Sequence, residues 1–279
     1  MDDDFDVVKA ADDSFERRPE RSWWLWVVVA ALAVATAAAL YLVAGRTRRD
    51  APAPAARQAS PGTLVRPLGG EAAPIDVPPL DRSDPVVREL VKQITSHPRI
   101  AAWLATDGLI RTMTVAIENV ASGATPASRF PALRPASGFE IIARGPDVQI
   151  SPRSYQRYDY LADVAASIDA AGASRVYATL KPRFDEAYHE LGYPDTPFDR
   201  TLERAIVSLL RTPIVDGAAR MEPRGIGYGF ADPSLEGLSG AQKQLLRTGP
   251  RNVRIIQTSL RDIALALGIP AERLPAAPR

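Results

Sequence analysis

The feature that most constrains this chain is an uncharged apolar run of 22 residues, WWLWVVVAALAVATAAALYLVA, at residues 23–44. A helix rises about 1.5 Å per residue, so this run is long enough to cross the roughly 30 Å hydrocarbon layer of a bilayer. Three tryptophans stand near its start and Tyr41 near its end, where aromatic rings favour the headgroup region. The run therefore predicts one transmembrane helix, with the lipid bilayer as its partner.

A cleaved secretory signal is the alternative interpretation of the same run. Small-x-small triplets such as Ala35-Thr36-Ala37 resemble cleavage sites. However, the apolar run continues beyond these triplets to Val43, and the region before it is acidic rather than basic. Both observations favour a permanent anchor.

The segments on either side of the apolar run indicate a tail before it and a linker after it. Residues 1–22 hold eight acidic and four basic residues with few apolar ones, which predicts a flexible acidic tail. Residues 45–79 are rich in Pro and Ala and predict an extended linker. Three arginines lie close to the run on each side, so the positive-inside rule does not decide the orientation. The linker favours a body held away from the membrane on the outer side.

The composition is rich in Ala, Arg and Pro and holds only four lysines, which is typical of high-GC bacterial genes. We therefore expect a single-pass protein of the bacterial inner (cytoplasmic) membrane with a periplasmic C-terminal domain.

The body predicts a mainly α fold: a helical domain at residues 80–268 with a minor β-hairpin, followed by a flexible tail at 269–279. Ser83 or Asp84 is a suitable N-cap and Pro85 suits the first helical position. Gly145-Pro146-Asp147 separates two apolar runs and predicts the hairpin. Residues 221–233 predict an irregular or weakly extended link. Apolar spacing predicts helices near residues 85–96, 99–104, 107–121, 153–169, 171–191, 198–211, 240–248 and 250–267.

Several kinds of chemistry are disfavoured by the composition. The chain has no Cys and only two His, which excludes disulfides and thiolate metal sites. Neither a nucleotide-binding glycine motif nor a G-x-S-x-G elbow occurs. The 34 basic residues nearly balance the 33 acidic ones, so nothing attracts nucleic acid globally. We expect no cofactor, no metal and no nucleic-acid partner.

Two carboxylates are the only candidate catalytic residues. Glu186 and Glu203 lie on consecutive predicted helices, where an antiparallel pairing would bring them together, as glycoside hydrolysis requires. Glu186 and His189 also have the E-x-x-H spacing of di-iron bundles, but a second such motif is missing. We expect Glu186 to form a buried structural pair, so that Glu186→Gln would lower stability.

Basic residues near the C-terminus are the candidate binding residues. Lys243, Arg247, Arg251 and Arg254 recur at helical spacing, and Arg261 continues the series. Such a stripe fits an anionic partner, although Gly249-Pro250 interrupts it and solvated helix faces often carry similar charges.

Four strings in the body carry a resemblance to a known family. They are LDRSDPVVREL (80–90), SYQRYDYL (154–161), DEAYHELGYPDTPF (185–198) and GYGFADPSLEGLSGAQKQLLRTGPRN (227–252). Together they resemble the bacterial family catalogued as domain of unknown function 3014. The resemblance covers about residues 80–265 and implies a helical, membrane-tethered domain without an assigned activity or site residues.

These observations predict a single-pass, membrane-anchored interaction or scaffold domain of the cell envelope. Its expected partner is an envelope protein or an anionic polymer, and no catalytic activity is evident. The alternative is an envelope (peptidoglycan or glycan) hydrolase that uses the carboxylate pair.

Overall fold

The computed structural model describes residues 6–9, 67–145, 147–225 and 227–277. The predicted transmembrane helix at residues 23–44 lies outside these ranges. Within them, no single helix has the length and apolar character to cross a bilayer. The helices Pro98–Leu104 and Leu109–Ala121 meet both criteria only when taken together, and they are bent by 108° at the break between them.

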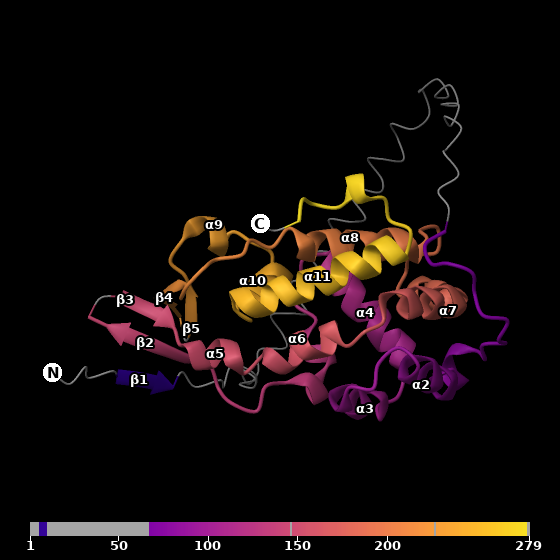
Figure 1. Cartoon of the computed structure of the whole chain (residues 1–279), viewed down its shortest axis with the longest axis horizontal. Helices are drawn as coiled ribbons and strands as arrows, with labels where there is room; N and C mark the ends of the chain where they lie inside the picture. The colour runs from indigo at the N-terminus through magenta and orange to yellow at the C-terminus, as the bar shows by residue number, and fades with distance from the viewer. Residues whose placement is uncertain (1–5, 10–66, 146, 226, 278–279) are drawn as a thin grey trace, which may run out of the picture. The chain divides into compact units, whose positions relative to one another are not determined.

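The described body is mostly helical, which confirms the mainly α part of the predicted fold class (Figure 1). The described body also contains the short 3-10 helices η1 (Leu80–Arg82), η2 (Ala127–Arg129), η3 (Pro131–Leu133) and η4 (Ala271–Arg273). The helices are α2 (Asp84–Lys92), α3 (Pro98–Leu104), α4 (Leu109–Ala121), α5 (Pro152–Gln156), α6 (Asp159–Ala166), α7 (Ala170–Glu190), α8 (Phe198–Leu210), α9 (Pro233–Glu236), α10 (Gly240–Leu246) and α11 (Pro250–Ala266).

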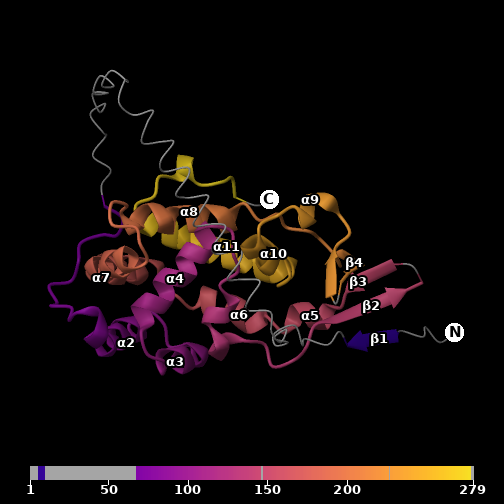
Figure 2. The ribbon, with the colours of Figure 1, turned by 180° about the vertical axis from the view of Figure 1, so that it is seen from behind.

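The largest hydrophobic cluster is built from the apolar faces of α2, α3, α4, α7, α8 and α11. Phe198 and Leu109 are fully buried in it, and Phe184 stacks on Phe198 with 5.3 Å between ring centroids. Both ribbon views show α11 lying along α8 and α6 (Figures 1 and 2). The spacing of the apolar residues thus predicted both the helices and the core.

The two helices α10 and α11 are separated by a turn that only glycine fits well. Gly249 has φ +87°, and a Cβ added to it would lie 2.6 Å from the Tyr155 ring. Glycine therefore allows α5 to pack directly against this turn.

The sheet is larger than the predicted hairpin. It has the antiparallel order β1-β2-β3-β4-β5, from β1 (Asp6–Lys9), β2 (Glu140–Arg144), β3 (Asp147–Ile150), β4 (Arg220–Arg224) and β5 (Gly227–Phe230). The predicted hairpin is β2–β3, with Ile141 opposite Ile150. The irregular or weakly extended link predicted at 221–233 is instead a second hairpin of β4 and β5, and Met221 pairs with Val148 of β3. A separate small cluster around Ile150, Met221 and Phe230 packs at the sheet.

Three further predictions differ from the structure. The segment 269–279, predicted to be a flexible tail, contains η4 and places Ile269 and Leu274 in the main core cluster. The four residues of β1 lie in the segment predicted to be a flexible tail, yet they pair with β2. The helix predicted over 153–169 is divided into α5 and α6 by a turn at Arg157 and Tyr158.

Residues 67–79, here called the strap, were predicted to be the end of the linker but pack on the helices. Leu68 and Val77 are each buried. Four strap amides donate hydrogen bonds to the body: Leu68 to Asp199 Oδ2 (3.2 Å), Gly69 to Leu267 O (3.0 Å), Gly70 to Ser174 Oγ (3.2 Å) and Ala73 to Thr179 Oγ1 (3.0 Å). The packed body therefore includes residues 67–79, which precede the predicted boundary at residue 80.

Candidate functional site

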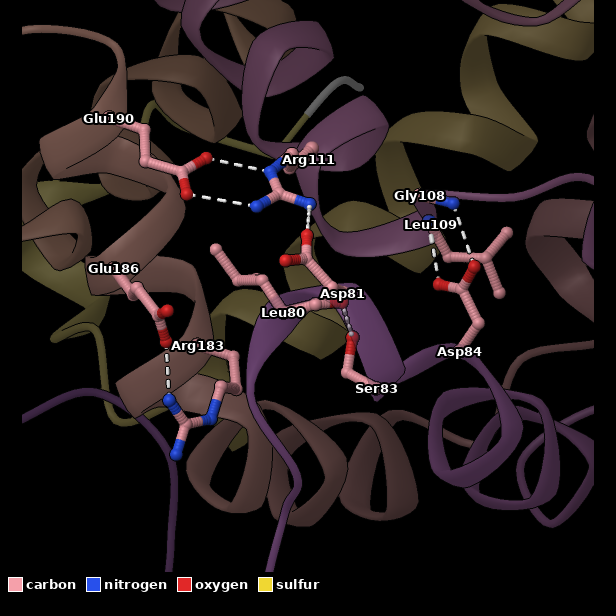
Figure 3. A network of polar contacts seen from close by, with 10 residues as sticks. All are labelled: Leu80, Asp81, Ser83, Asp84, Gly108, Leu109, Arg111, Arg183, Glu186 and Glu190. Carbon is pink, nitrogen blue, oxygen red and sulfur yellow. Dashed lines mark hydrogen bonds and ion pairs between the residues drawn. The ribbon is translucent and has the colours of Figure 1, made fainter.

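The two predicted catalytic carboxylates are each paired with an arginine of their own. Glu186 forms an ion pair with Arg183 one turn earlier on α7, and its side chain is 39% exposed (Figure 3). Glu203 on α8 lies 2.7 Å from Arg273 Nη2 of η4. The structure thus gives these carboxylates different partners in different segments. The expectation that Glu186 is a buried structural group was wrong, since its pair is a half-exposed one within a single helix.

A polar network near Glu186 joins α7, α4 and η1 (Figure 3). The Arg111 guanidinium donates to both carboxylate oxygens of Glu190, at 2.6 and 2.9 Å, and to Asp81 Oδ1 at 2.8 Å. These hydrogen bonds raise the pKa of Arg111, and the one to Glu190 lowers the pKa of that carboxyl group. The single guanidinium holds two carboxylates from different elements, so the network is a structural clamp with one excess negative charge.

Asp84 in the same view does not serve as the N-cap of its own helix. It accepts hydrogen bonds from the amides of Gly108 (2.7 Å) and Leu109 (2.9 Å) at the start of α4. Ser83, the other predicted cap, donates to Leu80 O at 2.9 Å. Both residues therefore connect neighbouring elements.

Three of the four cations predicted to bind an anion already form ion pairs with acidic residues of the body. Lys243 Nζ lies 2.8 Å from Glu236 Oε1, Arg254 Nη2 lies 2.6 Å from Asp216 Oδ1, and Arg251 Nη1 lies 3.6 Å from Asp159 Oδ1. Arg261, which continues the series, donates to Pro275 O. The predicted stripe is consequently divided into separate internal contacts.

Arg247 is the exception. Its guanidinium lies over the Phe230 ring, 5.3 Å from the centroid, and Nη2 reaches Tyr228 O at 3.5 Å. Burial lowers the pKa of Arg247, although Glu236 and Tyr158 act in the opposite direction. Among the described residues, no carboxylate lies within ion-pair distance of it. A desolvated cation without such a partner is energetically costly.

Arg157, which the sequence analysis did not single out, is a second cation of this kind. It occupies the break between α5 and α6, and its guanidinium contacts the rings of Phe139 and Tyr158 at 5.6 and 4.8 Å. It donates to Ser137 O at 2.9 Å and to the Tyr158 hydroxyl at 3.0 Å. Its Nε is buried and has no hydrogen-bond partner within the described part of the chain. No acidic partner is found there either.

Helix α10 brings the two arginines to one place. Gln244 Nε2 lies 3.3 Å from the Tyr158 hydroxyl, and Arg247 follows Gln244 by three residues, which puts both on one helix face. The positive charge of Arg157 contributes to the lowered pKa of Arg247, which indicates that the two guanidiniums are close enough to repel each other. We call Arg157, Tyr158, Gln244, Arg247 and Phe230 the arginine site.

The structure also locates the two histidines. His189 lines a shallow cavity of about 260 Å³ with Asp185 and Asp195. His97 caps α3, where its Nδ1 accepts a hydrogen bond from Arg99 N at 3.2 Å. The described ranges contain no group of three His, Asp or Glu side chains placed to hold a metal ion.

Sequence reasoning found Arg247 and missed the rest of the arginine site. Its signal was available in two of the strings that carry the family resemblance: Arg157 and Tyr158 lie in SYQRYDYL, and Phe230, Gln244 and Arg247 lie in GYGFADPSLEGLSGAQKQLLRTGPRN. The fold brings these separated strings together, which helical spacing could not show.

Comparison with models of known protein families gives a match over much of the described body. The model of the family described as "Protein of unknown function (DUF3014)" matches residues 109–264, more than half of the chain and all of the arginine site. No curated protein and no solved structure gives a significant match. The LDRSDPVVREL string lies before the matched range. The chain therefore belongs to the family of domain of unknown function 3014.

Proposed function

We propose that this protein is a membrane-anchored interaction domain of the cell envelope that binds an anionic group of its partner at the arginine site. The observation that carries the proposal is the pair of half-buried guanidiniums, Arg157 and Arg247, without an acidic partner among the described residues. An anion from outside would compensate the cost of holding both cations out of water. Anchoring and envelope location rest on residues 23–44.

The neighbouring acidic group, Glu236, supplies only part of this compensation. Glu236 accepts hydrogen bonds from Lys243 Nζ (2.8 Å) and from the amide of Phe230 (2.9 Å), and the bond from Lys243 is the main cause of its lowered pKa. Its charge is thus committed to Lys243. This arrangement leaves the arginine site with an excess of positive charge.

The alternative prediction of an envelope hydrolase gains no support from this geometry. Glu186 and Glu203 are each neutralised by their own arginine, whereas glycoside hydrolysis needs two carboxylates that face a common substrate. We therefore place the function at the arginine site.

Crosslinking of the full-length protein in its native cells tests the proposal. We expect Arg157→Gln and Arg247→Gln each to reduce capture of the partner at least several-fold, because hydrogen bonds to charged groups contribute about 1.5–3 kcal/mol. Arg254→Gln is the matched control, since Arg254 is exposed and already paired with Asp216. Capture by wild-type protein should also weaken as salt is raised.

Thermal melting of each variant separates loss of binding from loss of folding. A variant that melts like the wild type and captures less partner supports the proposal. Unchanged capture in both arginine variants, or an equal loss in the Arg254→Gln control, would contradict it.

A further inference from the structure

The hydrogen bonds at Tyr158 leave one strong donor unused. Its hydroxyl oxygen accepts from Arg157 Nη2 at 3.0 Å and from Gln244 Nε2 at 3.3 Å. A phenol that accepts two hydrogen bonds still has its own proton to donate. Within the described ranges that proton has no acceptor, although Tyr158 is only 6% exposed.

The guanidiniums offer further donors around the same hydroxyl. Arg157 Nε is buried and unpaired, and Arg247 uses only one long contact, at 3.5 Å to Tyr228 O. An arginine presents five N–H donors in a planar fork that fits the oxygens of carboxylates and phosphates. The site thus combines donors from two forks and one phenol, which approach from the α5–α6 turn and from the end of α10.

The charge of the site distinguishes between these anions. Arg157 and Arg247 together carry two positive charges, and Glu236 is already neutralised by Lys243. A carboxylate has one negative charge and would leave one desolvated guanidinium uncompensated. A phosphate monoester carries about −1.5 to −2 at pH 7 and has three terminal oxygens, enough for both forks and the phenol.

We infer that the arginine site binds a phosphoryl group, either of a soluble phosphate monoester or of a lipid headgroup, with the Tyr158 hydroxyl as the third donor beside Arg157 and Arg247. This inference rests on the proposed anion binding and specifies its chemistry. It makes Tyr158 a binding residue rather than part of the core alone.

Calorimetry on the full-length protein in neutral detergent tests the inference, with inorganic phosphate, glycerol 3-phosphate and acetate as probes. We expect both phosphates to bind and acetate to bind at least tenfold more weakly, because a monoanion leaves one cation uncompensated. Phosphate binding should strengthen from pH 5.5 to 7.5, since the second pKa of a phosphate monoester is about 6.

Two variants and one control connect this binding to the site. Tyr158→Phe should weaken phosphate binding about tenfold, in line with the loss of a hydrogen bond to a charged group. Arg247→Gln should weaken it further. Tyr160→Phe is the control, because the Tyr160 hydroxyl already donates to Leu133 O. Should Tyr158→Phe fold poorly, Arg247→Gln and the pH dependence still decide the result.

Nanodiscs of phosphatidylcholine with and without phosphatidic acid distinguish the two sources. Binding that requires phosphatidic acid and is displaced by glycerol 3-phosphate assigns the site to a lipid headgroup, and binding of the soluble ester alone assigns it to a soluble ligand. Acetate binding as strong as phosphate binding, lost in Arg247→Gln, would overturn the phosphoryl inference and leave the proposed anion binding intact. Failure of every anion to bind would overturn this inference, while partner capture in cells still tests the proposed function separately.

Discussion

At the residue scale, the polar side chains that matter most for folding act across elements rather than within them. Asp84 belongs to the first turn of α2, but its carboxylate accepts the first amides of α4, whose own N-cap is Gly108 and offers no side chain. Its side chain is 16% exposed, so water competes little for these bonds. Asp84 therefore fixes the angle between two helices and satisfies a helix terminus at the same time.

The contrast with Glu186 gives a prediction. We expect Asp84→Ala to lower the free energy of unfolding by about 1–2 kcal/mol, as for loss of an N-cap. Glu186→Gln should change it by no more than about 0.5 kcal/mol, because a half-exposed pair three residues apart on one helix contributes little. Urea unfolding of both variants, followed by circular dichroism, measures the difference. A larger loss in Glu186→Gln than in Asp84→Ala would contradict this assignment.

The candidate site shows what a sequence can reveal at this scale. Arg247 was found because cations at helical spacing form a recognisable pattern. Arg157 was not found, because its importance comes from an unpaired Nε and from rings on other segments. Whether a charge is paired depends on tertiary contacts, so helical spacing alone could not separate Lys243 and Arg254, which have acidic partners, from Arg247.

At the element scale, local patterns predicted the helices and the first hairpin but not the second. Residues 220–230 include Pro223 and two glycines that lie within β5, and these residues disfavour strands. The strands form because Met221 pairs with Val148 of β3 and Phe230 is fully buried. Their stability comes from a neighbouring strand more than 70 residues away in sequence, which local propensity does not contain.

The strap was missed for a related reason. Its composition is that of a linker, with only Leu68 and Val77 buried. Its amides are satisfied by Asp199, Ser174 and Thr179, which lie more than 100 residues later. Extended segments of this kind give no periodic signal.

The strap leads to a prediction about where the folded body begins. We expect a chain of residues 67–279 to melt cooperatively, and one of residues 80–279 to melt several degrees lower. Burial of a Leu or Val side chain contributes about 1.5–3 kcal/mol, and 1 kcal/mol corresponds to about 2–4 °C in a domain of this size. Differential scanning calorimetry of both chains measures the shift. The double variant Leu68→Ala/Val77→Ala in the longer chain should reproduce most of it, and equal melting temperatures would show that the strap does not stabilise the body.

At the scale of the whole molecule, one observation and one sequence prediction set opposite requirements on topology. The register Val7 opposite Ile142 places residues 6–9 beside β2. A helix that crosses the membrane at residues 23–44 would instead place them on the side opposite the body. Both conditions cannot hold in one chain within a sealed membrane. Pairing of β1 with β2 is therefore a direct measure of topology.

Two introduced cysteines can test whether β1 pairs with β2 in the membrane, because the chain itself contains no Cys. For Val7→Cys/Ile142→Cys we expect a disulfide after solubilisation in detergent, where the tail can reach the body, and none in intact membranes. A reporter that is active only outside the cytoplasm, fused after Arg279, should be active, and the protein should resist carbonate extraction. Val7→Cys/Leu265→Cys is the control for random crosslinking, since Leu265 is exposed on α11. A disulfide in intact membranes would place tail and body on the same side and would rule out the predicted single-pass anchor.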